Sequence, residues 1–234
     1  FYTFQILAYQ IDTAKGAATE ASSFKSFFLF VAFFPQLIAG PIVRAQYLLP
    51  QIERIFKKKK KRICIVSYGL SLFLLGAFKK IVVADSIAPF VDEIFSFGPE
   101  TIWWAWVGRI LFSFQIYFDF SGYSDMAIGS AYLLGIRLPT NFMTPYISRG
   151  PKEFWNRWHI TLSTWIRDYL YIPLGGNRGA LFKNGFVIIA TMALAGLWHG
   201  ADITFVLWGA AWGIYIFLVR FFNWVKLPIV ISIA

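Results

Sequence analysis

The sequence contains a single cysteine, Cys64, and only two histidines, His159 and His199. One cysteine excludes an internal disulfide bond, and we expect the Cys64 thiol, at the start of an apolar run, to be buried and inert. The histidines are far apart along the chain, and no His-x3-His pair, GxGxxG motif or P-loop occurs. The sequence therefore gives no indication of a bound metal or of a nucleotide-binding loop.

Charged residues are also scarce. They make up 15% of the sequence, whereas 58% of the residues are apolar and 20% are aromatic. Soluble domains usually contain about 25% charged and about 45–50% apolar residues. A soluble fold of this composition would expose much apolar surface to water, whereas lipid can cover that surface. The composition therefore predicts an all-α, multi-pass integral membrane protein.

The charges that are present are mostly basic, with 22 Lys and Arg against 12 Asp and Glu. They cluster between apolar runs, most densely at residues 57–62 (KKKKKR). This clustering argues against nucleic-acid binding, which needs a basic face on a polar surface. It is typical of a cytoplasmic loop beside anionic lipid headgroups, so we place residues 46–62 in the cytoplasm.

Three apolar stretches approach the length of about 20 residues that crosses a bilayer. They are residues 63–84, 102–118 and 203–222. The tryptophans at the start of the second stretch are typical of a membrane interface. We expect a loop over residues 85–101 between the first two stretches.

Other stretches are shorter or more polar. Residues 24–37 are apolar but contain Pro35, which predicts a short or re-entrant helix. Residues 152–172 combine tryptophan, tyrosine and charge, which predicts a helix lying at the membrane interface. No internal repeat or linker is found, so we predict a single domain over residues 1–234. The chain starts at Phe1 without a signal peptide, and we expect it to be a central and C-terminal section of a longer protein.

His199 is the most prominent candidate for chemistry. It follows the apolar residues 186–198 and precedes another apolar run. An ionisable side chain at membrane depth is costly and is by default a functional hypothesis, although it can also simply hydrogen-bond across a helix pair. Gly196 and Gly200 beside it would let another helix or a ligand approach the backbone closely.

His159 lies within the predicted interfacial helix, where residues four apart share a face. A stripe with an aromatic ring, an imidazole, a hydroxyl and a guanidinium suits a polar ligand at the edge of a bilayer, although an ordinary amphipathic helix explains it equally well. The two stripes are Trp155, His159, Ser163 and Arg167 on one face, and Arg157, Thr161 and Asp168 on another.

Three further patterns are weaker. Asp119 and Asp125 could form a proton relay in a transporter, but we favour helix caps at a span boundary. Ser163 near His159 resembles a nucleophile and its base only weakly, since this spacing is common by chance. Residues 175–179 (GGNRG) lack a strand and helix around them, so we expect a turn.

Several motifs resemble the membrane-bound O-acyltransferase (MBOAT) family, in its bacterial alginate O-acetyltransferase branch. The resemblance covers essentially the whole chain, and residues 196–200 (GLWHG) are similar to the histidine motif of the family. The other matching runs are residues 34–42, 118–127, 141–146, 154–159, 163–165 and 167–178.

This resemblance implies tilted and partly re-entrant helices around a central tunnel, in a multi-pass protein of the bacterial plasma (inner) membrane. It implies an O-acetyltransferase of alginate or exopolysaccharide biosynthesis, with no bound cofactor and an acyl thioester, acetyl-CoA or an acyl carrier, as co-substrate. The implied partners are the lipid bilayer, an extracytoplasmic acetyl-transfer protein or the polysaccharide itself, and a cytoplasmic acyl-donor protein, with no nucleic acid.

The resemblance also implies the site. It places the catalytic histidine at His199 and the second family histidine at His159. The substrate-binding residues that we expect are Trp198, Asn156, Arg157, Ser163, Trp165, Arg167, Asp168 and Tyr171.

The chemistry agrees with these assignments. A neutral imidazole at about pH 7 can take the proton of an acceptor hydroxyl, which typically contributes 10²–10⁴-fold to the rate. The thioester carbonyl then becomes a tetrahedral oxyanion that needs hydrogen-bond donors. The sequence leaves the donor open among His159, Trp198, Asn156 and Arg167.

Two alternatives remain at this level. The family also transfers D-alanyl groups to cell-wall polymers, although residues 172–178 (IPLGGNR) are more similar to the alginate branch. A transporter or channel that uses the charged residues between its helices is the alternative from another class.

Overall fold

The computed structural model describes residues 2–17, 21–37, 40–56, 63–99 and 101–224. These residues form helices joined by turns and loops, and no strand occurs among them, which confirms the all-α prediction. The basic run 57–62 lies outside the described residues, and so does the side chain of Cys64. The contacts divide the chain into two compact units, Phe1–Asn141 and Phe142–Ala234, while the single domain stays a prediction.

The first unit begins with short helices around an apolar core. Among its elements, α3 is amphipathic, with Leu48, Leu49 and Ile52 buried along one face. The break predicted near Pro35 is confirmed, because α2 and η1 are separate short elements. These elements are α1 (Tyr2–Ala14), α2 (Phe24–Val31), the 3-10 turn η1 (Phe34–Gln36) and α3 (Ala45–Phe56).

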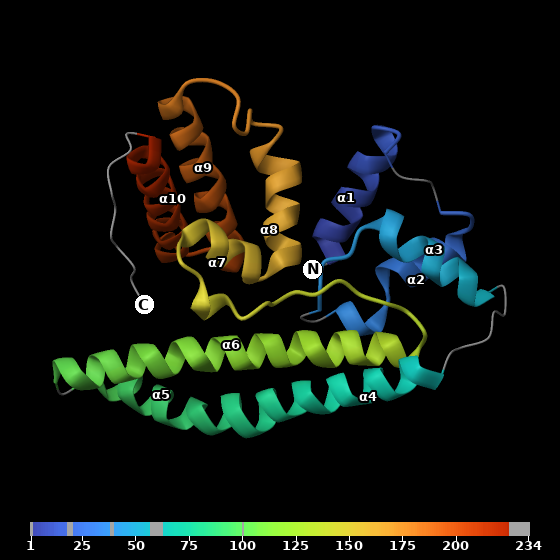
Figure 1. Ribbon diagram of the computed structural model, residues 1–234, viewed down its shortest axis with the longest axis horizontal. Coiled ribbons are helices and arrows are strands. Elements are labelled where there is room, and N and C mark those ends of the chain that lie inside the picture. The colour runs from blue at the N-terminus through green and yellow to red at the C-terminus, as the bar shows by residue number, and fades with distance from the viewer. Residues whose placement is uncertain (1, 18–20, 38–39, 57–62, 100, 225–234) are drawn as a thin grey trace. The chain divides into compact units, whose positions relative to one another are not determined.

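The rest of the first unit is a long helical pair (Figure 1). One arm is α4 (Ile63–Ala77), the π-helical segment η2 (Phe78–Ala84) and α5 (Asp85–Phe97), and the other is α6 (Ile102–Leu133). The arms pack closely because glycines face backbone: a Cβ at Gly69 would lie 2.9 Å from the carbonyl oxygen of Gly129. The prediction of a loop over residues 85–101 is wrong, because α5 continues the helix to Phe97.

The prediction that Asp119 and Asp125 cap helices is also wrong. Both lie inside α6, and both carboxylates pair with lysines of η2. Lys79 Nζ lies 2.6 Å from Asp125 Oδ2, and Lys80 Nζ lies 2.8 Å from Asp119 Oδ1. The sequence around each aspartate does not distinguish a helix cap from an ion pair, because the lysine partner lies more than thirty residues away along the chain.

The second unit is a cluster of helices that carries both histidines. Figure 1 shows α9 and α10 running side by side. The remaining elements are short. The single helix that we expected over residues 152–172 is therefore not continuous: it is divided into α7, α8 and η4. The elements are the 3-10 turn η3 (Pro145–Ile147), α7 (Pro151–Arg157), α8 (Ile160–Ile166), the π-helical segment η4 (Arg167–Tyr171), α9 (Leu181–His199) and α10 (Ile203–Trp224).

Two helices in the described part of the chain are long and apolar enough to cross a membrane, Leu181–His199 and Ile203–Asn223. The second matches the span predicted over residues 203–222, and the first contains the apolar residues 186–198 noted before His199. The predicted spans 63–84 and 102–118 differ: the former ends in the π-helical segment with its two lysines, and the latter is the first half of α6.

Candidate functional site

The chain breaks its helix immediately before and at His159. Trp158 is extended, and His159 adopts the left-handed conformation with φ 41° and ψ 54° before α8 begins. A non-glycine residue held in that region costs on the order of 1–3 kcal/mol, and such residues cluster at functional sites. The break also corrects the predicted stripe, because Trp155 and His159 do not lie on one continuous helix.

The ring of His159 is enclosed. The residue is only 1% exposed. The ring of Phe142 stacks on the imidazole with centroids 6.3 Å apart, and the ring of Trp198 lies at the same centroid distance with an interplanar angle of 63°. Burial lowers the pKa of His159 to about 3, and repulsion from His199 adds to this. A side chain with this pKa is a neutral imidazole at physiological pH.

His199 lies in a more exposed environment than His159. It is the last residue of α9, and the residue is exposed. Aromatic rings flank it, with Trp198 at 5.0 Å, Trp208 at 5.3 Å and Phe205 at 6.4 Å between ring centroids. His199 therefore combines an accessible imidazole with an aromatic surround.

Glycines bring α10 close enough to α9 to form that surround. A Cβ at Gly196 would overlap the carbonyl oxygen of Phe205, and one at Gly209 would overlap that of Met192. Small residues of this kind let two apolar helices pack backbone to backbone in a membrane. The close approach predicted at Gly196 and Gly200 is confirmed, since Gly200 lies against the ring of Phe205.

An aromatic cluster beside the histidines was missed by the sequence reasoning. Trp212 of α10 stacks on Phe154 of α7 with centroids 5.3 Å apart, and it meets Trp155 at 5.4 Å. Trp155 in turn contacts Trp208, which meets His199. The spacing of Trp208 and Trp212, four residues apart on α10, was the available signal. The indole Nε1–H of Trp155 is buried and donates to no partner among the described residues.

Trp198 is the residue that links the two histidines. Its ring contacts both His159 and His199, so these three predicted site residues are brought together. Trp165 is buried and packs on Tyr169 at 4.9 Å, which makes it part of the interior of this unit. Asn156 is exposed on α7.

Arg157 and Ser163 hold backbone in place. The Arg157 guanidinium pairs with Glu153 at 2.9 Å and donates to the carbonyl oxygen of Met143 at 3.2 Å, which fixes the loop before α7. The Ser163 hydroxyl donates to the carbonyl oxygen of Trp158 at 3.2 Å, across the break at His159. This bond argues against Ser163 as a nucleophile activated by His159.

The remaining predicted residues lie along η4. Arg167 is exposed and pairs with Asp168 at 2.7 Å. The Tyr171 hydroxyl donates to Asn177 Oδ1 at 2.7 Å, and the guanidinium of Arg220 donates to the same oxygen at 2.7 Å. This network ties the predicted turn 175–179 to α10, so Tyr171 is placed to support that turn.

No three His, Cys, Asp or Glu side chains gather to hold a metal ion in the described residues. The model of the membrane-bound O-acyltransferase (MBOAT) family matches residues 8–228. This chain belongs to that family. The resemblance noted from the sequence motifs is thereby confirmed.

MBOAT relatives with different named acceptors are similar to this chain. A protein of Azotobacter vinelandii named "probable alginate O-acetylase AlgI" is 46% identical over 94% of the chain and 43% of its own length. A peptidoglycan O-acetyltransferase of Helicobacter pylori is 41% identical over 92% of the chain and 45% of its length. A teichoic acid D-alanyltransferase of Bacillus subtilis is 27% identical over 95% of the chain and 58% of its length. The chain thus spans less than half the length of the O-acetyltransferases it matches.

Proposed function

We propose that this chain is the histidine-bearing part of a multi-pass bacterial inner-membrane O-acetyltransferase. It transfers an acetyl group from a cytoplasmic thioester, acetyl-CoA or an acyl carrier protein, toward hydroxyls of an exported polysaccharide. The accessible imidazole of His199, at the end of an apolar helix and walled by aromatic rings, carries the proposal. Family membership and the O-acetyltransferase relatives support it.

In the proposed reaction, His199 acts as general base. Its neutral imidazole takes the proton of the acceptor hydroxyl, and the oxygen attacks the thioester carbonyl. The tetrahedral intermediate collapses, the C–S bond breaks, and the imidazolium returns the proton to the leaving thiolate. Acceptor ester and free thiol are the products, so His199 ends in its starting state.

The surrounding rings contribute apolar surface beside the base. Trp198, Trp208 and Phe205 border the imidazole, and such surface limits the water next to a bound thioester. We propose that the indole N–H groups of these two tryptophans donate hydrogen bonds to the oxyanion, in preference to Asn156 and Arg167. Arg167 is already paired with Asp168.

His159 has a positioning role in this scheme. Its burial keeps it from touching substrate, and its ring packs against Trp198, which also contacts His199. It therefore acts through Trp198 on the orientation of the catalytic imidazole. An extracytoplasmic partner protein that hands the acetyl group to the polymer completes the proposed path.

The test supplies membranes containing the full-length protein with acetyl-CoA labelled in its acetyl group, or with a D-alanyl-loaded carrier protein, and follows label into polymer. Transfer of the acetyl label from acetyl-CoA, and no transfer of D-alanine, is the expected result. Retention of D-alanine alone would replace the proposal by the second candidate, D-alanyl transfer, which the Bacillus subtilis relative favours. Label in neither case would contradict both.

A further inference from the structure

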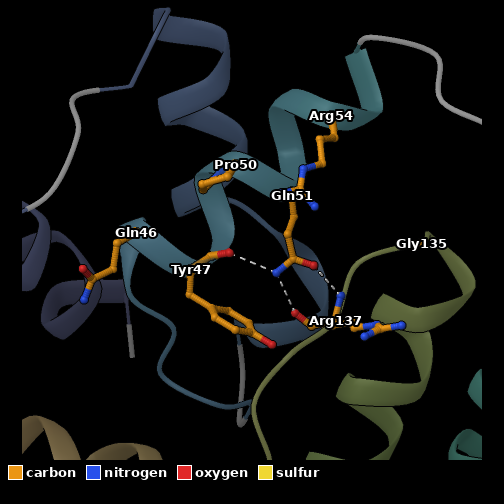
Figure 2. Close-up of a pocket in the computed structure, with 7 residues that line it drawn as sticks. All are labelled: Gln46, Tyr47, Pro50, Gln51, Arg54, Gly135 and Arg137. Atoms are coloured by element: carbon orange, nitrogen blue, oxygen red, sulfur yellow. Dashed lines mark hydrogen bonds between the residues drawn. The ribbon is translucent and has the colours of Figure 1, made fainter.

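A pocket that is separate from the histidine site lies in the first unit (Figure 2). It is an open pocket of about 600 Å³ between the polar face of α3 and the turn that follows α6. It is remote in sequence from both histidines, and the proposed acyl transfer does not use it. Its lining residues are Gln46, Tyr47, Pro50, Gln51, Arg54, Gly135 and Arg137.

The register of α3 decides which face the pocket uses. Tyr47, Gln51 and Arg54 follow one another at helical spacing, while Leu48 and Ile52 on the other face are buried in the core. The apolar face is therefore already occupied by the protein's own interior. The polar face of α3 is the face that borders the pocket.

The pocket wall is fixed by Gln51. Its Nε2 donates to the carbonyl oxygens of Tyr47 at 3.0 Å and Arg137 at 3.1 Å, and its Oε1 accepts from the Arg137 backbone N–H at 2.9 Å (Figure 2). The two bonds to Arg137 hold the chain after α6 against α3, and the bond to Tyr47 lies within α3 and orients the Gln51 amide. The bonds to Arg137 set its side chain beside the same pocket as Arg54, although 83 positions separate them in the sequence.

The residues that line the pocket are either basic or uncharged. It contains two guanidiniums, the amide of Gln46 and the hydroxyl of Tyr47, and no carboxylate. Neither Arg54 nor Arg137 forms an ion pair with another described residue. Guanidinium groups bind phosphate in a bidentate manner, with charge-assisted hydrogen bonds. We propose that this pocket binds a phosphate group, carried either by an anionic lipid headgroup or by a soluble phosphorylated molecule.

The test uses the full-length protein purified in a neutral detergent, with residues 57–62 kept intact. Affinity is measured by calorimetry for dioctanoyl phosphatidylglycerol, for inorganic pyrophosphate, and for dioctanoylglycerol, which lacks phosphate. The wild type is expected to bind at least one of the phosphate probes and to ignore dioctanoylglycerol. R54A and R137A are each expected to bind that probe about tenfold more weakly, the loss of a charge-assisted contact.

The matched control is K15A, which removes one exposed positive charge from the same unit, outside the pocket. Its affinity is expected to stay within about twofold of wild type, since exposed charges away from the ligand are screened. Binding of phosphatidylglycerol alone would identify a lipid headgroup, and binding of pyrophosphate would identify a soluble ligand; either supports the pocket. No binding of either probe, or equal binding by wild type, R54A and R137A, would overturn the proposal.

Discussion

Exposure separates the two histidines more sharply than their position in the sequence does. His159 is enclosed and held in a left-handed conformation, whereas His199 is accessible at the end of its helix. A group that transfers protons to and from a substrate must reach it, so accessibility favours His199 as the base. The strained, buried histidine is instead suited to fixing its neighbours.

The burial of His159 leads to a prediction about pH and stability. Its pKa is about 3 in the folded protein and returns to about 6.5 in the unfolded chain. Between these values the unfolded chain binds a proton that the folded protein excludes, so acidification below pH 6.5 lowers the free energy of unfolding. Above pH 6.5 this contribution is absent. By linkage the effect is at most about 1.4 kcal/mol for each pH unit.

The measurement compares thermal stability of wild type and H159Q in detergent at pH 7.5 and pH 5.0. Glutamine cannot take up the proton, so H159Q should lose less stability than wild type between the two values. Equal losses in both proteins would show that His159 is not buried as a neutral ring.

At the scale of elements, the α9–α10 pair places His199, and its glycines determine how close the helices come. G196A should destabilise the full-length protein by about 1–3 kcal/mol, because the added methyl group meets the backbone of Phe205, which cannot move aside as a side chain does. Thermal stability in detergent measures the loss. G150A is the control, since nothing lies within 4 Å of a Cβ at that position. A G196A protein as stable as G150A would refute this packing.

Sequence reasoning recovered the elements whose causes are local. The break between α2 and η1 near Pro35 and the close approach at Gly196 and Gly200 were both predicted, because backbone sterics decide them. The break at Trp158 and His159 could not be predicted in the same way. No proline or glycine marks it, and bonds such as that from Ser163 to the Trp158 carbonyl stabilise it only in the folded unit.

Long-range contacts explain the other misses. Asp119 and Asp125 were assigned to caps because their lysine partners lie on a different helix. The aromatic cluster of Phe154, Trp155 and Trp212 also joins separate elements, so no single stretch of sequence contained it.

At the scale of the whole molecule, the chain joins two units with different tasks in this account. The second unit holds the histidines and the aromatic surround of the proposed transfer site. The first holds a long helical pair with its lysine–aspartate pairs, and a pocket suited to phosphate. The decisive experiment therefore measures the proposed acyl transfer directly.

That experiment measures transfer of labelled acetyl groups to polymer by membranes containing wild type, H199Q or H159Q at matched protein levels. Glutamine removes the base while keeping a polar side chain. H199Q should reduce transfer by at least about 100-fold, the contribution of general-base catalysis, and H159Q should reduce it less. H199Q membranes that acetylate polymer as fast as wild type would contradict the assignment of His199 as the catalytic base.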